Sequence, residues 1–265
     1  MKKLMTLVIV AAVAFAGLMV GCRKQAANNV TKFTVGFDAE FPPYGFKDDK
    51  TGEYTGFDLD LAQEVANRNG WQLVKKPINW DAKDMELNSG AIDCIWNGFT
   101  INGRENEYEW TEAYVDNSQV VLVKAGSPIK TIADLKGKVV AAQTDTPVLK
   151  ALQEGGDKAD VGKTFKKIVV TANYNNAVME LESGAVDAVA MDIGVAKKKV
   201  DDAPGKFLML DEQIMSEKYG IGFKLGNKEL RDKVQNTFKQ MVADGSAAKI
   251  SAKWFEGKDV IILKP

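Results

Sequence analysis

Four short stretches of the sequence concentrate polar side chains that could bind or transform a small molecule. Each follows a predicted strand, and together they comprise Asp38 to Phe41, Trp96 to Thr100, Gln143 to Thr146, and Met191-Asp192. They offer carboxylate, amide and hydroxyl groups but no imidazole, because the chain contains no histidine. No G-x-S-x-G motif or metal-ligand spacing is found, so we expect binding of a polar molecule with no cofactor and no metal.

An internal duplication organises the elements that position these stretches. The segment Met85 to Asp93 (MELNSGAID) recurs 94 residues later as Met179 to Asp187 (MELESGAVD). Each copy predicts the end of a helix stopped by glycine, followed by a short strand at 92–96 or 186–191. A weaker similarity relates residues 34–42 to residues 139–147. Each of these segments predicts a strand that leads into a loop containing proline.

Helical patterns alternate with these strands. A helix is predicted from Gly56-Phe57-Asp58 to Gly70, because Leu59, Ala62 and Val65 can share one face. The alternation predicts two similar α/β units. Ligands of open α/β sheets bind beyond the carboxyl ends of the strands, and two facing units form a cleft suited to a small molecule.

The N-terminus has the features of an export signal. Lys2 and Lys3 precede an apolar run from Leu4 to Val20, which is shorter than a membrane-spanning helix of about 20 residues. The run ends in Leu18-Met19-Val20-Gly21-Cys22, which resembles a bacterial lipobox. We therefore expect a signal peptide over 1–21, lipid attached to Cys22, a polar tether over 22–31 and an extracytoplasmic globular part; an uncleaved anchor with an incidental cysteine is the alternative.

Composition limits the class of protein. The 265 residues are 45% hydrophobic and 27% charged, with a net charge of −1, which predicts a compact globule and gives no electrostatic reason to expect nucleic acid. With Cys22 lipidated, Cys94 has no partner for an internal disulfide. It lies in the apolar run Ile92 to Trp96, where a buried structural thiol is favoured over a nucleophile.

The segment Gly56 to Ala66 (GFDLDLAQEVA) resembles the signature of the bacterial extracellular solute-binding proteins, family 3, the polar amino-acid receptors of ABC importers. Other matching segments occur in the same order: Gly98-Phe99-Thr100-Ile101 with Arg104, Tyr114 to Ser118, the Ala-Val-Asp-Ala run at 185–188, and Ala248-Lys249-Ile250 with Lys253-Trp254-Phe255. The resemblance implies a monomer that captures a polar L-amino acid and delivers it to an ABC permease in the membrane.

The same resemblance implies an α/β, two-lobed, periplasmic-binding-protein-like (type II) clamp with a ligand cleft between the lobes. When the division of the family fold is applied to this sequence, lobe 1 comprises residues 30–121 and 219–265, and lobe 2 comprises residues 122–218. The segment Gly220-Ile221-Gly222 then belongs to a hinge strand.

Site residues follow from the family positions. Arg104 matches the arginine that holds the ligand carboxylate with its planar fork, and Asp192 matches the acid that binds the ammonium group. Hydroxyl and backbone N–H donors are expected from Gly98, Thr100 and Thr146, and Thr146 is also placed to cap a helix beginning at Pro147.

The remaining expected contacts concern the ligand side chain. Phe41 and Trp80 occupy family positions for aromatic rings that sandwich it. Asp38 is the candidate that contacts the distal polar end of the ligand side chain, together with Asn97 and Gln143. A carboxylate at this position favours a ligand with a basic or amide side chain. Because the two charged partners come from different lobes, only the zwitterion itself is expected to bridge the cleft.

Two departures from the family pattern and several alternatives stay open. The loop Ile101-Asn102-Gly103 is one residue shorter than usual, and Pro147 stands where a backbone N–H could donate. Taken alone, Arg104 reads as a surface charge and Asp192 as a helix cap. Two other functions compete with the binding role: a lyase or dehydratase on the same scaffold, and an extracytoplasmic amino-acid sensor.

Overall fold

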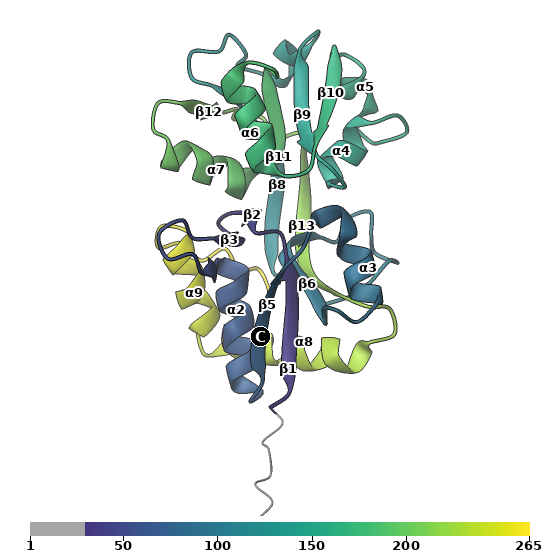
Figure 1. The fold of residues 1–265 in the computed structure, drawn as a ribbon, viewed down its shortest axis with the longest axis vertical. Coiled ribbons are helices and arrows are strands. Elements are labelled where there is room, and N and C mark those ends of the chain that lie inside the picture. The colour runs from purple at the N-terminus through teal and green to yellow at the C-terminus, as the bar shows by residue number, and fades with distance from the viewer. Residues whose placement is uncertain (1–29) are drawn as a thin grey trace, which may run out of the picture. The chain divides into compact units, whose positions relative to one another are not determined.

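The computed structural model describes residues 30–265. The predicted signal peptide, Cys22 and all but the last two residues of the tether lie outside the described residues. The compact unit from Thr31 to Pro265 alternates strands and helices, which confirms the predicted α/β class (Figure 1).

Its elements divide into two lobes joined by two long strands, β8 (Val115–Lys124) and β13 (Met215–Phe223), which run through both (Figure 1). Lobe 1 contains β1 (Lys32–Phe37), β2 (Glu40–Phe41), β3 (Gly45–Lys47), β4 (Tyr54–Thr55), α2 (Phe57–Arg68), β5 (Gln72–Pro77), η1 (Trp80–Ala82), α3 (Lys83–Asn88), β6 (Cys94–Thr100), β7 (Glu109–Trp110), α8 (Lys228–Ala243) and α9 (Ser246–Trp254). Lobe 2 contains η2 (Ile132–Leu135), β9 (Val139–Gln143), α4 (Pro147–Leu152), α5 (Ala159–Gly162), β10 (Lys167–Thr171), α6 (Tyr174–Ser183), β11 (Ala188–Asp192), α7 (Ile193–Asp202) and β12 (Phe207–Met209).

One sheet connects the lobes through these strands. Its order is β10-β9-β11-β8-β13-β6-β1-β5, with β12 paired to β8 and β7 paired to β13. β8 and β13 are antiparallel, from Met215 opposite Gln119 to Tyr219 opposite Val115. The predicted lobe boundaries, 121/122 and 218/219, fall within these two strands, and the positions at which one lobe passes into the other stay a prediction.

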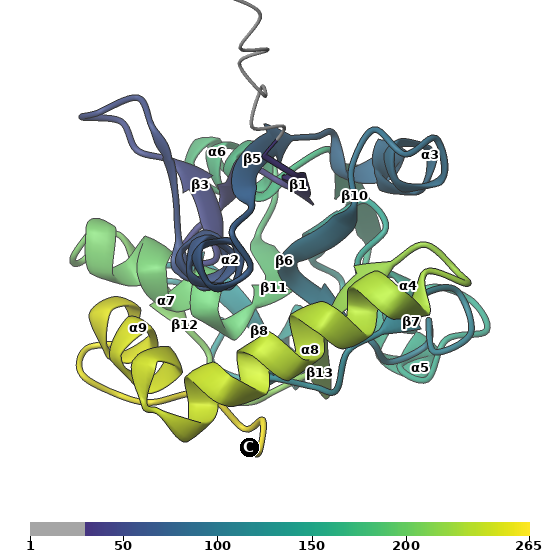
Figure 2. The same ribbon diagram turned by 90° about the horizontal axis from the view of Figure 1, so that it is seen from below.

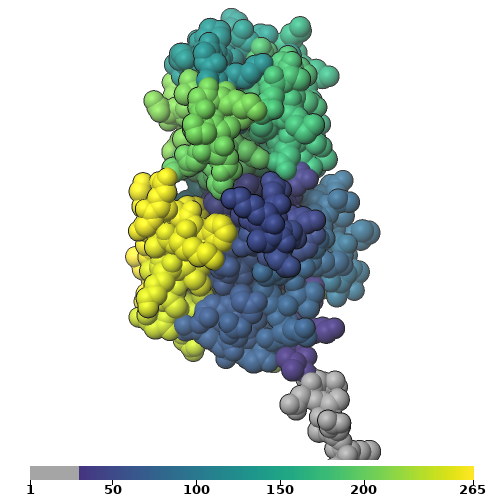
Figure 3. Space-filling view, turned by 60° about the vertical axis from the view of Figure 1, so that its left-hand side comes forward, coloured from purple at the N-terminus to yellow at the C-terminus, as the bar shows by residue number. Residues whose placement is uncertain are grey.

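Buried apolar strands explain the core of each lobe. β9 (VVAAQ) and β11 (AVAMD) are parallel neighbours whose small and β-branched side chains are buried on both faces, as expected for a parallel sheet covered by helices. In lobe 1 the buried stripe of α2 packs toward the sheet, and α8 crosses the strands at the far end of the lobe (Figure 2). Figure 3 shows lobe 2, in teal and green, in contact with the purple and yellow segments of lobe 1 on one face of the molecule.

The duplicated segment has the same structure in both lobes, as predicted. α3 and α6 end beside Gly90 and Gly184, which have φ values of 76° and 82° that suit glycine. The following strands, β6 and β11, begin two residues later than predicted. The final aspartate of each copy holds the first strand of its lobe: Asp93 accepts from the Thr34 N–H at 2.7 Å, and Asp187 from the Val139 N–H at 2.8 Å.

Candidate functional site

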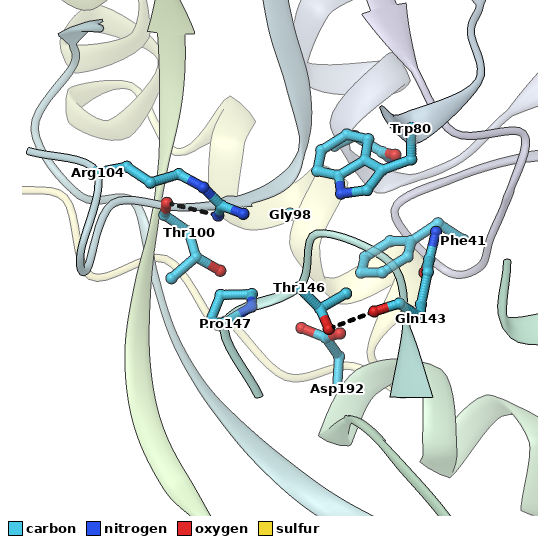
Figure 4. Close-up of a pocket in the computed structure, with 10 residues that line it drawn as sticks. Phe41, Trp80, Gly98, Thr100, Arg104, Gln143, Thr146, Pro147 and Asp192 are labelled. Carbon is cyan, nitrogen blue, oxygen red and sulfur yellow. Dashed lines mark hydrogen bonds between the residues drawn. The ribbon is translucent and has the colours of Figure 1, made fainter. Parts of the chain in front are cut away.

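A cavity of about 310 Å³ lies between the lobes, where the carboxyl ends of β6, β9 and β11 converge (Figure 4). Pro147 and nine of the ten residues expected to contact the ligand line it: Phe41, Trp80, Asn97, Gly98, Thr100, Arg104, Gln143, Thr146 and Asp192. The structure thus brings together residues that are up to 151 positions apart in the chain.

Arg104 enters the cavity from the loop after β6 and is 8% exposed. Its guanidinium lies 5.1 Å from the centre of the Phe99 ring and donates to the Asp145 carbonyl oxygen at 2.7 Å and to the Thr100 carbonyl oxygen at 3.4 Å. Burial lowers the pKa of Arg104, yet a guanidinium stays protonated in proteins. The shorter loop therefore still delivers a buried cation to the cavity, and the interpretation of Arg104 as a surface charge is wrong.

Asp192 ends β11 on the lobe 2 side of the cavity and is 3% exposed. It occupies the N-cap position of α7, as the alternative interpretation expected, but its carboxylate makes no cap bond to the helix. Four neutral groups donate to its carboxylate instead: Asn117 and Gln119, each at 2.9 Å, Tyr174 at 2.7 Å, and the Tyr219 hydroxyl. Burial raises the pKa of Asp192, while its hydrogen bonds favour the ionised form.

Two of the expected donors have partners within the protein. The Gly98 N–H donates to the buried Asp58 carboxylate at 2.6 Å, so this N–H is not free for a ligand and that expectation is wrong. The Thr146 hydroxyl donates to the Gln143 carbonyl oxygen at 2.8 Å and accepts from the Leu149 N–H at 3.4 Å. Thr146 therefore caps α4 as predicted, and Pro147 is the first residue of that helix.

The aromatic residues Phe41 and Trp80 lie beside one another at the lobe 1 wall (Figure 4). The Phe41 ring stacks on Tyr174 of lobe 2 with a centroid distance of 5.7 Å and an interplanar angle of 28°. Trp80 packs edge-on against Phe99 at 5.4 Å, and its indole N–H donates to the Asp145 carbonyl oxygen at 3.3 Å. Both rings are fixed by neighbours, which suits a wall that packs against a ligand side chain.

Asp38 differs from the other predicted residues because it lines a second cavity, together with Glu40, Trp80 and Asp81. Its carboxylate accepts from the Gln143 side-chain amide at 2.8 Å, and its N–H donates to Asn97 at 2.7 Å. The shared Trp80 and these two amides place Asp38 directly behind the first cavity. Burial raises the pKa of Asp38.

Two polar atoms of the first cavity are buried without a hydrogen-bond partner in the described part of the chain: Asn97 Nδ2 and Gln143 Oε1. The first is a donor and the second an acceptor. Buried polar atoms are normally paired, so each of these two has an unused capacity for a hydrogen bond.

Contacts between the lobes were underestimated from the sequence. Lys83 is 1% exposed and forms an ion pair with the carboxylate of Asp145 in lobe 2. The backbone carbonyl oxygen of Asp145 accepts hydrogen bonds from Arg104 and Trp80 of lobe 1. Gln143 adds its bond to Asp38. The expectation that only a zwitterion bridges the cleft is therefore wrong, because side chains of the protein join the lobes directly.

Several residues of the site were missed from the sequence. They are the donors to Asp192 and the cross-cleft pair: Lys83, Asn117, Gln119, Asp145, Tyr174 and Tyr219. One available signal was the pair of amide residues, Asn117 and Gln119, which lie two positions apart in one strand and therefore on one face of it.

Residues 33–257 match the family model described as "Bacterial extracellular solute-binding proteins, family 3". The chain belongs to this family. The resemblance found in the sequence is thereby confirmed. No helix within residues 30–265 has the length and apolar composition needed to cross a membrane, and no cluster of potential metal ligands occurs in the same range.

Similar proteins bind amino acids. The L-cystine-binding protein TcyJ of Escherichia coli K12 is 30% identical over 229 residues, covering 85% of this chain and 83% of its own. A Streptococcus pneumoniae ABC uptake transporter substrate-binding protein with bound histidine is 29% identical, with a TM-score of 0.81 over 88% of this chain and 95% of its own. An ancestral arginine-binding protein bound to glutamine is 35% identical, with a TM-score of 0.77 over 84% of this chain and 97% of its own. These likenesses confirm the two-lobed type II clamp.

Proposed function

We propose that this family 3 protein is the substrate-binding component of an ABC importer and captures a polar L-amino acid with a basic or amide side chain. The observation that carries the proposal is the convergence of Arg104 from lobe 1 and Asp192 from lobe 2 on one cavity of about 310 Å³. A guanidinium and a carboxylate at opposite ends of a buried cavity match the carboxylate and ammonium of an amino acid. In this proposal Arg104 holds the carboxylate and Asp192 the ammonium.

The side-chain class is argued from the remaining polar atoms. The unpartnered Asn97 donor and Gln143 acceptor suit a group that both donates and accepts, such as an amide. Asp38, immediately behind them, adds negative charge that suits an amide N–H or a cation. Phe41 and Trp80 then pack against the apolar part of the ligand side chain.

Closure of the lobes draws on two contributions, direct contacts within the protein and contacts with the ligand. Lys83, Arg104 and Trp80 all contact Asp145, so part of the free energy of closure comes from the protein. A ligand that touches Arg104 and Asp192 adds differential affinity for the closed form, which is the requirement for a ligand-driven shift. A permease that recognises the closed form would receive loaded protein preferentially.

The cellular setting follows from the N-terminal pattern and from the relatives. Lipid attached to Cys22 would hold the protein at the outer face of the cell membrane, beside its permease. Relatives named for ABC transport of arginine and glutamine support the importer role.

A calorimetric screen of the twenty amino acids and cystine tests the proposal. We expect at least one of arginine, lysine, histidine, glutamine and asparagine to bind with a Kd near 1 μM, about −8 kcal/mol. Arg104→Met should remove measurable binding, whereas Arg68→Met, which alters a surface ion-pair network of lobe 1, should not. Binding unaffected by Arg104→Met would contradict the assignment, and conversion of an amino acid into a product would favour an enzyme instead.

A further inference from the structure

Two buried carboxyl groups next to the cavity share the same hydrogen-bond donors. Asn117 Nδ2 lies 2.9 Å from Asp192 Oδ1 and 2.6 Å from Glu217 Oε1. Gln119 Nε2 lies 2.9 Å and 2.7 Å from the same two oxygens. The sheet register explains the cluster, since Asp192 of β11 lies opposite Gln119 of β8, and Glu217 of β13 lies opposite Asn117.

No lysine or arginine within residues 30–265 forms an ion pair with either carboxyl group; every bonded donor named for them is a neutral amide or hydroxyl. Asp192 and Glu217 are each only 3% exposed. Two adjacent carboxylates in a buried site repel one another and lose hydration, so a pair of this kind holds one proton between them.

The hydrogen bonds indicate which partner holds that proton. Both oxygens of Asp192 accept hydrogen bonds, four in all, which stabilise an anion. Glu217 Oε1 accepts two, but Glu217 Oε2 is buried with no partner in the described residues. An ionised carboxylate with one bare buried oxygen is costly, whereas a neutral carboxyl group tolerates that environment better.

We propose that Glu217 carries a proton at neutral pH and so keeps Asp192 as the single anion of the pair, poised for the ligand ammonium group. The inference rests on the proposed function, because the ammonium partner of Asp192 is itself proposed. Glu217 is a positioning residue here: it acts through Asp192 and through the two amides that they share.

The surroundings support this distribution of charge. Burial and the neighbouring Asp192 carboxylate raise the pKa of Glu217 to about 8. The other titratable groups around the pair are Tyr44, Tyr174 and Tyr219, whose pKa values burial raises well above the ordinary value, and the more distant Arg104. Those tyrosines stay neutral, so the Glu217 carboxyl is the group beside Asp192 that titrates in the mildly alkaline range.

Arrival of an ammonium group links this proton to binding. A positive charge beside Asp192 stabilises negative charge on the pair and therefore lowers the pKa of Glu217. Near pH 8, where the free protein retains part of this proton, capture of an amino acid should release a fraction of a proton to solvent. The ligand ammonium takes the place of the released positive charge.

The proton is tested without any ligand. In wild-type protein carrying 13C-glutamate, one glutamate carboxyl resonance should titrate near pH 8, and it should be missing from Glu217→Gln. Thermal melts from pH 5 to pH 9 should show the Tm of Glu217→Gln rising by several degrees relative to wild type as pH increases, since glutamine mimics the neutral acid at every pH. Asp116→Asn, which alters the exposed neighbour of Asn117 on β8, should follow wild type. Titration of every glutamate below pH 6 would overturn the proposal, even if the variant failed to fold.

The link to binding is tested by calorimetry at pH 8 with L-glutamine and L-arginine as probes, each in two buffers of different ionisation enthalpy. Wild type should release a fraction of a proton per ligand bound, and Glu217→Gln should bind with no release. Equal proton release by both proteins would overturn the link. Failure of every amino acid to bind would instead contradict the proposed function, and the carboxyl titration would still decide where the proton lies.

Discussion

Arg104 of lobe 1 and Asp145 of lobe 2 are joined by a 2.7 Å hydrogen bond from the guanidinium Nη2 to the Asp145 carbonyl oxygen. The Asp145 carboxylate also pairs with Lys83. The backbone of Asp145 has a φ of 50°, which is unusual for a residue other than glycine. One residue of lobe 2 thus uses its backbone and its side chain to hold two cations of lobe 1. We call Lys83, Arg104 and Asp145 the cross-cleft triad.

Weakening the cross-cleft triad should open the free protein. Lys83→Met keeps an apolar side chain beside Trp80 but removes the ion pair with Asp145. Because Asp145 is half exposed, we expect a moderate loss of amino-acid affinity, roughly tenfold or about 1.4 kcal/mol, together with a larger radius of gyration in small-angle scattering.

Lys76→Met is the matched control, because Lys76 pairs with Glu86 inside lobe 1 and leaves the contacts between lobes intact. An unchanged radius of gyration and unchanged affinity for Lys83→Met would show that the triad does not hold the lobes together.

Stability should fall as pH rises from 5 to 8. Burial raises the pKa of Asp58 to about 7 from an ordinary value of 3.8, so the folded state binds a proton that the unfolded chain has lost. The stabilising contribution is complete below about pH 4 and lost as pH rises through 7, a total change on the order of 4 kcal/mol, of which roughly 2 to 3 kcal/mol falls between pH 5 and pH 8. Asp38, Asp192 and Glu217 shift in the same direction.

Urea unfolding at pH 5, 6, 7 and 8 measures this dependence. The lowered pKa values of exposed acids such as Asp134 and Asp244 affect stability only below about pH 4, outside that window. A free energy of unfolding that stays level or increases from pH 5 to pH 8 would contradict the raised pKa of the buried Asp58 carboxyl group.

The aromatic wall should contribute to affinity through the ligand side chain. Trp80→Ala removes ring surface from the cavity and the indole hydrogen bond to Asp145. We expect a 10- to 100-fold loss of affinity for a large polar amino acid and a smaller loss for glycine, measured by calorimetry. Trp71→Ala provides the comparison, since Trp71 packs on Phe33 at the opposite end of lobe 1. Equal losses in both variants would indicate general destabilisation instead of a ligand contact.

Membrane attachment should depend on one thiol. In cells expressing the full chain, Cys22→Ser should move the protein from the membrane fraction to the soluble fraction, because the acceptor for lipid is gone. Retention of Cys22→Ser in membranes, at the length of the uncleaved chain, would favour an N-terminal helix as the anchor. Cys94→Ser controls for loss of a cysteine elsewhere, in a buried strand.

Local sequence patterns were sufficient to predict the framework of the fold. Glycine at the end of each duplicated helix needs φ near 80°, and the aspartate that follows bonds to the first strand of its lobe. The glycine that ends each helix and the aspartate that bonds to the strand both lie within the duplicated segment, so the repeat makes them recognisable in the sequence. Nine predicted residues share one cavity because most of them lie at or beside the carboxyl ends of strands that meet between the lobes. Asn97, Gly98 and Thr100 were expected in the loop after a strand and instead lie within β6.

The environment of the charged groups could not be predicted in this way. The burial of Lys83 depends on a loop from the other lobe, and in sequence the lysine follows Trp80-Asp81-Ala82 and resembles an exposed residue. The partnership of Asp192 with Glu217 depends on the register of β8 against both β11 and β13. Such registers are set by the packing of whole strands and are not encoded by any local motif.

The central claim is that Arg104 and Asp192 hold the two ends of one zwitterion, and its most direct test is calorimetric titration with chemically blocked ligands. The tightest-binding amino acid is compared with its N-acetyl derivative, which lacks the ammonium, and with its methyl ester, which lacks the carboxylate. We predict that each blocked form binds at least 100-fold more weakly than the free amino acid. Binding of either blocked form as tightly as the free amino acid would contradict the account.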